Sequence, residues 1–165
     1  MTSTTWVTVV FVVLANWLKT NTGKSPALVG FDFLFCGRGY SDWYDENKPY
    51  NEAKALYDKN GIPAFSWHWR DPSRKTEEFY TDKTTFDISK ITDVNSAEYK
   101  AMIADIDYTA NLLKRFQDNK IPILWRPLHE AAGGWFWWGA KGAAPCKKLW
   151  QVMFDRMVNY HGLHN

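Results

Sequence analysis

Three apolar segments, each followed by a stretch of helical character, organise the chain. They cover residues 27–35 (ALVGFDFLF), 62–69 (IPAFSWHW) and 121–128 (IPILWRPL). Near-continuous apolar runs of this length are typical of parallel strands that are covered on both faces. Pro122 comes near the start of the third run, where a missing backbone N–H is best tolerated. The pattern therefore predicts three buried, parallel strands.

The segments that follow the apolar runs predict helices. In the longest one, apolar residues recur every three or four positions and form a single stripe. Asn95 and Glu98 have the spacing of a capping box at its start, and Gly162 can end the last helix. Alternation of strand and helix is the order of a parallel α/β fold. The predicted helices cover residues 50–60, 96–119 and 147–160.

The first fifteen residues fit two interpretations. The apolar run at 6–14 is too short to span a bilayer, and the tripeptide at 13–15 (VLA) resembles a signal-peptide cleavage site. However, the preceding MTSTT lacks the positive charge of a secretory signal. The β-branched composition of residues 7–13 equally suits a first buried strand. Residues 1–15 are therefore either an export signal or a strand of the fold.

Composition narrows the class of partner. A chain of 165 residues with no linker predicts one domain over residues 1–165, and a net charge of +2 argues against nucleic acid. The four histidines show no zinc pattern, so we expect no metal, and nothing predicts an organic cofactor or a membrane partner. Pairing of Cys36 with Cys146 stays open. Aromatic residues, 17% of the chain with ten tryptophans, are the outlier.

Glu130 is the first candidate for chemistry. It follows the third predicted strand and His129, at the end where α/β proteins place catalytic groups, and it precedes a Gly-Gly turn and the run WFWW. A carboxyl group beside apolar rings is desolvated, which favours its protonated form. Such a group can serve as a general acid. The alternative is a solvated glutamate at a strand end.

The aromatic run at 135–138 predicts a wall for sugar rings, whose apolar faces stack on tryptophan. In an extended segment alternate side chains face opposite sides, so about two of the four rings should face substrate. We expect these to be Trp135 and Trp138, with the others in the core.

The end of the second strand adds further candidates. Trp67 and His68 lie at a position equivalent to that of His129, which predicts a shared polar pocket with substrate contacts. A histidine of this kind, taken alone, is more often part of the core. Arg126 is expected to orient a carboxylate through a forked hydrogen bond.

These motifs resemble a known family. RPLHEAAGGWFWWG at 126–139 looks like the acid/base signature of glycoside hydrolase family 26, which contains β-mannanases and related β-glycanases. FSWHW at 65–69 is similar to the preceding strand motif of the family. The segments 26–35 and 148–165 also resemble family segments, so the resemblance covers about residues 16–165.

The resemblance implies a (β/α)₈ TIM barrel, of which this chain holds about the first four βα units. It implies retaining hydrolysis with Glu130 as acid/base, His129 as its neighbour, and Trp135 and His68 at the subsite of the cleaved sugar. It implies a β-mannan substrate, with glucan or xylan as alternatives within the family, and an extracellular or periplasmic setting.

A second carboxylate is the missing part. The family's nucleophile is a glutamate on a later barrel strand, so the chain is expected to stop before the second half of the barrel and to be weakly active or inactive alone. Asp32, Asp42, Asp45 and Asp71 are interpreted as turn residues or hydrogen-bond acceptors. Unpaired strand edges predict self-association. The rival classes are a non-catalytic glycan-binding fragment and a truncated product without activity.

Overall fold

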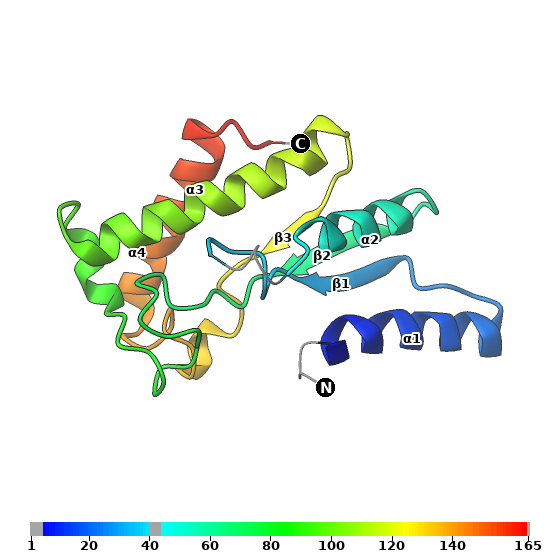
Figure 1. Ribbon diagram of the computed structural model, residues 1–165, viewed down its shortest axis with the longest axis horizontal. Coiled ribbons are helices and arrows are strands. Elements are labelled where there is room, and N and C mark those ends of the chain that lie inside the picture. Colours follow the sequence, from blue (N-terminus) through cyan, green and yellow to red (C-terminus); the bar gives the residue numbers. More distant parts are fainter. Residues whose placement is uncertain (1–4, 40–43, 165) are drawn as a thin grey trace.

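The computed structural model describes residues 5–39 and 44–164. The order of elements is helix, then three strands that each lead into a helix (Figure 1). Three short helical segments, η1 (Ile88–Thr92), η2 (Ala131–Gly133) and the π-helical η3 (Asp155–Tyr160), complete it. The main elements are α1 (Thr5–Thr22), β1 (Leu28–Asp32), α2 (Asn47–Tyr57), β2 (Ile62–Ser66), α3 (Ala97–Asp118), β3 (Leu124–Arg126) and α4 (Ala143–Phe154).

The strands form one parallel sheet in the order β1-β2-β3. Asp32, the last residue of β1, is level with Ser66, and Ser66 is level with Arg126 at the end of β3. Neighbours in the sheet are thus neighbours in the chain, as in the wall of a βα barrel. The predicted α/β class is confirmed as a partial barrel, with three strands within the described residues.

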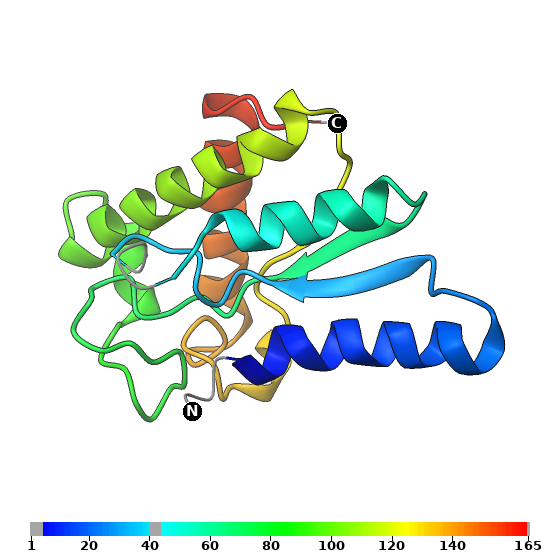
Figure 2. The same ribbon diagram turned by 45° about the vertical axis from the view of Figure 1, so that its right-hand side comes forward.

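The expected strand at residues 7–13 is wrong, because these residues belong to α1. The helix continues through the more polar segment up to Thr22 and lies against β1 (Figures 1 and 2). The preference of β-branched residues for strands is weak and depends on context, so it does not by itself decide the type of element. No helix among the described residues has both the length and the apolar character needed to cross a membrane.

Each strand is shorter than its apolar run. β2 ends at Ser66 although the run continues to Trp69, and β3 holds three residues of the predicted eight. Residues 33–35, 67–69 and 127–128 follow the strands at the C-terminal edge of the sheet, whereas residues 121–123 precede β3. An apolar run reports burial, and burial continues past the last residue that pairs in the sheet.

The longest predicted helix is confirmed as α3, but its cap is not the predicted one. Ser96, not Asn95, is the N-cap, and its hydroxyl oxygen accepts a hydrogen bond from the backbone N–H of Tyr99 at 3.0 Å. Glu98 turns instead to Lys90, at 3.1 Å from its ammonium nitrogen. The apolar stripe of α3 is buried as expected and contributes Met102, Ile106, Ala110, Leu113 and Phe116.

The C-terminal helix is tied to α3 by charge. Arg156 donates to both carboxylate oxygens of Asp107, at 2.6 and 2.8 Å, and Nε2 of His161 lies 2.8 Å from the same carboxylate. These hydrogen bonds hold the pKa of Asp107 below its ordinary value. Gly162, at φ +68°, follows the helical segment as the sequence predicts.

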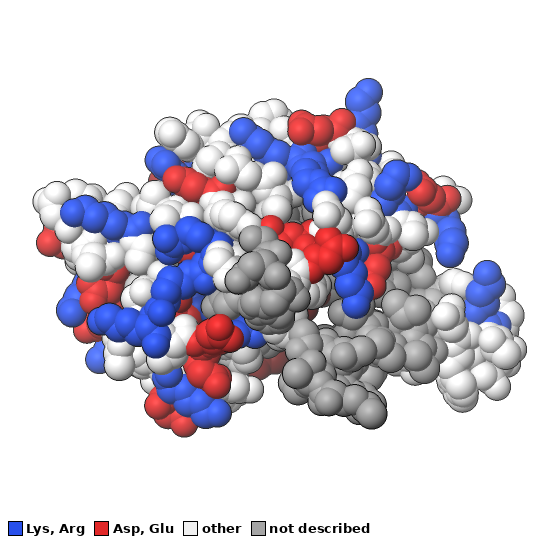
Figure 3. Space-filling view, in the orientation of Figure 1, with Lys and Arg blue, Asp and Glu red and all other residues white. Residues whose placement is uncertain are grey.

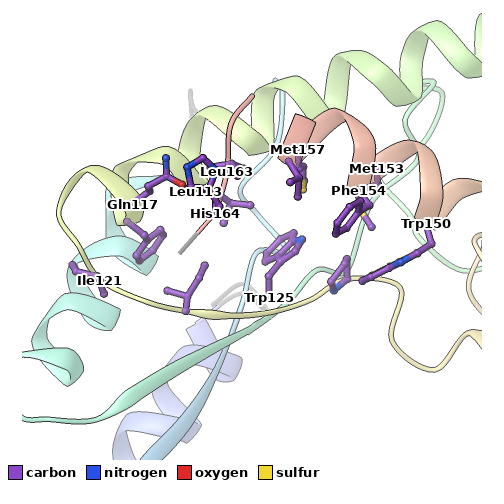
Figure 4. Close-up of a pocket in the computed structure, with 14 residues that line it drawn as sticks. Leu113, Gln117, Ile121, Trp125, Trp150, Met153, Phe154, Met157, Leu163 and His164 are labelled. Atoms are coloured by element: carbon purple, nitrogen blue, oxygen red, sulfur yellow. Dashed lines mark hydrogen bonds between the residues drawn. The ribbon is translucent and has the colours of Figure 1, made fainter. Parts of the chain in front are cut away.

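An apolar trough lies beside β3, between α3 and the segment formed by α4 and η3 (Figure 4). It has a volume of about 210 Å³, and Trp150 and Phe154 at its rim are each about half exposed. The indole N–H of Trp125, at its base, is buried and has no hydrogen-bond partner in the described part of the chain. Other lining residues include Leu113, Phe116, Ile121, Ile123, Met153, Met157 and Leu163.

Candidate active site

The C-terminal edge of the sheet gathers the polar residues that the sequence singled out. Asp32 ends β1, His68 follows β2 by two residues, and His129 and Glu130 follow β3 by three and four. Parallel strands bring their C-terminal ends to one edge, so residues far apart in the chain meet there. The expected meeting of His68 and His129 is seen in the structure.

A continuous hydrogen-bonded chain links three of these side chains. Nδ1 of His68 lies 2.6 Å from Oδ2 of Asp32, and Nε2 of His68 lies 3.2 Å from Nε2 of His129. The backbone N–H of His68 also donates to Oδ1 of Asp32, at 3.3 Å. From the sequence, Asp32 is interpreted only as a turn residue or hydrogen-bond acceptor. The feature that could have indicated a role in the site is a carboxylate within an otherwise apolar predicted strand.

His129 is held in a setting that disfavours its charged form. Burial lowers the pKa of His129, and the neighbouring His68 lowers it further, against the opposing pull of Asp32 and Glu130. Its Nδ1 is buried and has no hydrogen-bond partner among the described residues. The side chain is therefore a neutral imidazole near neutral pH, and its Nδ1 is unpaired among the described residues.

Glu130 is exposed, which corrects the expectation of a desolvated carboxyl group. The indole N–H of Trp135 donates to its Oε2 at 3.1 Å. Leu128 and Glu130, on either side of His129, both have φ of +55°, a conformation that non-glycine residues rarely adopt. Strain of this kind, about 1–3 kcal/mol per residue, persists where the surrounding structure enforces it and is common at functional sites.

Trp135 presents its ring to solvent, with 50% of its surface exposed. Its ring lies across Gly133, where a Cβ atom would collide with it. The loop after β2 anchors this segment, because Thr81 donates to the carbonyl oxygens of Trp135 and Gly134 at 2.7 and 2.8 Å. Thr81 was not a sequence candidate, since no local pattern links the two loops.

Two predicted substrate contacts are wrong for this structure. Trp138 is 0% exposed and Trp67 is 3% exposed, so neither ring can stack on a sugar. Trp138 instead donates its indole N–H to the carbonyl oxygen of His129 at 2.9 Å, and Trp67 stacks on Trp69 with centroids 4.1 Å apart. The segment turns after Phe136, so strict strand alternation does not apply.

Arg126 does not make the expected fork. It is exposed and forms no hydrogen bond or ion pair with any residue that the structure describes. It still acts at a distance, because its charge is one of the influences that lower the pKa of His129. The predicted role in orienting a carboxylate therefore has no support within the described part of the chain.

Three of the other carboxylates behave as expected, as hydrogen-bond acceptors. Asp71 is buried and accepts from Ser73, and Asp45 accepts from the backbone and side chain of Asn47. Asp32 accepts from His68. Asp42 lies outside the described residues. Within the described residues no cluster has the donors of a metal site, and Cys36 and Cys146 are both free.

Charged side chains of both signs lie on the surface of the described residues. On the face seen in Figure 3, lysine and arginine side chains are interspersed with aspartate and glutamate. The absence of a nucleic-acid partner stays a prediction, which depends on the net charge of +2.

Comparison with known proteins gives relatives of one kind. A mannan endo-1,4-β-mannosidase of Thermothelomyces thermophilus is 41% identical over 160 residues, which are 92% of this chain and 33% of that protein. A crystal structure of a β-mannanase from a symbiotic protist of the termite Reticulitermes speratus, in complex with gluco-manno-oligosaccharide, matches with a TM-score of 0.86. It is 44% identical, over 90% of this chain and 48% of that one.

A β-(1,4)-mannanase of Podospora anserina matches with a TM-score of 0.82 and 40% identity, over 90% of this chain and 36% of that one. The chain thus spans between a third and a half of the length of these relatives. The sequence profile of Glycosyl hydrolase family 26 matches residues 5–165, which includes α1 and extends the resemblance toward the N-terminus. A match over nearly the whole chain, with relatives of this identity, shows that the chain belongs to glycosyl hydrolase family 26.

Proposed function

We propose that this chain supplies the acid/base half of the active site of a retaining endo-β-1,4-mannanase. The observation that carries the proposal is the joining of Glu130 to the exposed ring of Trp135, beside His129, at the C-terminal edge of a parallel sheet. The names of the relatives support mannan or glucomannan as the substrate class, and we include galactomannan as a further β-mannan.

The arrangement suits a sugar physically. The exposed face of Trp135 offers apolar surface to a pyranose ring, while its N–H is already used by Glu130. Binding a sugar against this ring removes water from the carboxyl group, and loss of water favours its protonated form. The exposed Glu130 of the free chain thus becomes a better proton donor once substrate covers it.

The mechanism requires two carboxylates about 5–5.5 Å apart. Glu130 gives its proton to the glycosidic oxygen while the second carboxylate attacks the anomeric carbon and forms a glycosyl ester. Glu130 then takes a proton from water, which attacks the ester and releases the sugar with retained configuration. We expect the nucleophile to come from outside these residues, since Asp32, Asp45 and Asp71 are held by other groups.

The location of the complete protein is also a proposal. Polymeric mannan does not enter cells, so an enzyme that cleaves it works in an extracellular or periplasmic space. Export of the protein from expressing cells, followed with an antibody, tests this point.

The test is a reducing-sugar assay on soluble β-mannan, with Glu130→Gln compared with Glu77→Gln. Glu77 is exposed, and its carboxylate lies 3.4 Å from the guanidinium of Arg70. Its substitution therefore controls for the loss of one surface charge. Activity that disappears in Glu130→Gln alone supports the acid/base role and places the second carboxylate within reach of this chain. Activity that survives in Glu130→Gln contradicts that role.

If the parent chain and its variants fold but are all inactive, the acid/base role is tested in a longer chain that carries a substitution of the same residue. There, Glu130→Ala should lose polymer cleavage but still cleave an aryl mannobioside whose phenol leaves without a proton. A variant equally inactive on both substrates would contradict the assigned role.

A non-catalytic glycan-binding fragment is the second candidate, and the exposed ring of Trp135 is the observation in its favour. Such a module needs the ring but not the acid. Retention of manno-oligosaccharide affinity in Glu130→Ala, with no cleavage by any longer chain, would favour it. Parallel assays on β-glucan and xylan decide among the alternative substrates.

A further inference from the structure

We propose that Asp32 is a positioning residue of this site, which sets the proton positions of both His68 and His129 from the end of β1. The proposal concerns side chains of the same edge of the sheet as the proposed function. Its test reads protons rather than turnover, so either proposal can fail without the other.

The first ring is fixed by two contacts to one carboxylate. Oδ1 of Asp32 accepts the backbone N–H of His68, and Oδ2 lies 2.6 Å from Nδ1 of the same residue. A carboxylate can only accept, so Nδ1 of His68 must carry a proton. In the neutral ring Nε2 is then an acceptor.

The position of the proton on His129 follows from the position of the proton on His68. Nε2 of His129 lies 3.2 Å from Nε2 of His68, and a hydrogen bond between two nitrogens needs one donor and one acceptor. When His68 is neutral its Nε2 accepts, so Nε2 of His129 must donate. The lowered pKa of His129 leaves this ring with one proton, so its Nδ1 is bare.

The consequence is a defined acceptor in the site. Nδ1 of His129 is buried and has no partner among the described residues, and a buried acceptor without a donor is unfavourable. Asp32 therefore leaves Nδ1 of His129 as an acceptor, which can receive a hydrogen bond from a donor but cannot give one. The sequence around Asp32 does not indicate an effect on His129, because that effect is transmitted through the imidazole ring of His68.

Trp138 and Phe136 hold the geometry that this chain of hydrogen bonds needs. Trp138 donates to the carbonyl oxygen of His129, and the ring of Phe136 lies 5.4 and 5.5 Å from the rings of His129 and His68. The charged groups that act on His129 are Asp32, Glu130 and Arg126, together with His68. Of Asp32, Glu130 and Arg126, Asp32 is the one that is hydrogen-bonded to His68, the ring paired with His129.

The test is ¹⁵N NMR of the imidazole nitrogens in the 165-residue chain with labelled histidine, at a pH where both His68 and His129 are neutral. We expect protonated Nδ1 and bare Nε2 in His68, and the reverse in His129. A bare Nδ1 in His68, or a protonated Nδ1 in His129, would overturn the proposal without any variant.

Asp32→Asn provides the causal test. The backbone N–H of His68 will keep the amide oxygen on its side, so the amide NH₂ will face Nδ1 of His68 and donate to it. His68 must then carry its proton on Nε2, and His129 must move its own proton to Nδ1. We expect inversion of both tautomers.

Asp107→Asn is the matched control, because Asp107 lies 2.8 Å from Nε2 of His161 at a separate His–carboxylate contact. It should change the nitrogen signals of His161 and leave those of His68 and His129 in place. Folding of each variant is checked by its backbone amide spectrum. If Asp32→Asn folds and leaves the His129 tautomer unchanged, Asp32 does not act on that ring.

Discussion

Residues of the same type take different roles in the aromatic run at 135–138. Trp135 is exposed and bonds to Glu130, whereas Trp138 is buried and bonds to the backbone of His129. One ring is therefore available to a ligand, and the other is part of the core that holds the histidine. This difference can be measured, since the first role affects binding and the second affects stability.

Trp135→Ala should lower affinity for manno-oligosaccharides about 3- to 10-fold, because one aromatic contact is worth about 0.5–1.5 kcal/mol. Its unfolding free energy should change by less than about 1 kcal/mol, as is usual at the surface. Trp138→Ala should instead lose about 3–5 kcal/mol of stability through the cavity it leaves. Calorimetric titration and urea denaturation of both variants measure the two effects, and equal stability losses would contradict the division.

The pH dependence of stability gives a second test at this scale. Folding lowers the pKa of His129 below the ordinary value of 6.5, so the unfolded chain binds more protons between those two pKa values. Stability should therefore fall as the pH drops below about 6.5.

His129→Gln should reduce this fall, which urea denaturation at several pH values measures. Asp107 does not interfere, because its lowered pKa places its own loss of stability below pH 3.8. An identical pH profile in the variant would show that His129 is not the group responsible.

At the scale of elements, the start of α3 shows how one residue decides a boundary. Ser96 accepts the N–H of Tyr99 and also donates to the carbonyl oxygen of Lys90 at 2.9 Å. It thereby joins α3 to the short helix η1 before it. Asn95, one residue earlier, has an exposed side chain and no such role.

Ser96→Ala should cost about 1–2 kcal/mol of unfolding free energy, because an N-cap is lost. Asn95→Ala is the matched control and should leave stability within about 0.5 kcal/mol of the parent. Chemical denaturation of the pair measures both values. A larger loss in Asn95→Ala than in Ser96→Ala would restore the predicted capping box.

At the scale of the whole molecule, the apolar trough and the edge of β3 lie together. The trough runs along the outer side of β3, whose other edge pairs with β2, and Trp150 and Phe154 stand exposed at its rim (Figure 4). Exposed strand edges and large apolar patches favour association. The relatives, at two to three times the length of this chain, have further residues to cover such a surface.

We expect the isolated chain to self-associate with rising concentration, and Trp150→Lys to reduce this. A charge at the rim is costly to bury in a contact between copies. Tyr57→Lys, which places a charge on the exposed side of α2 away from the trough, is the control. Sedimentation velocity over a range of concentrations measures the effect, and equal association in both variants would place the contact elsewhere.

The α/β class, three strands, the helices that follow them and the motif around Glu130 could all be predicted from the sequence. These features depend on local periodicity and on short motifs, which are written in adjacent residues. His68 and His129 could be paired in advance because parallel strands end at one edge.

The exposure of each aromatic ring, the type of the first element and the contacts between loops depend on the tertiary structure. Which of four aromatic rings is exposed depends on where the loop turns, and α1 is a helix although β-branched residues have a weak preference for strands. The hydrogen bonds between Asp32 and His68 and between Thr81 and Trp135 join residues that are 36 and 54 positions apart. Contacts across such separations leave no local pattern, since they arise only when the sheet brings its loops together.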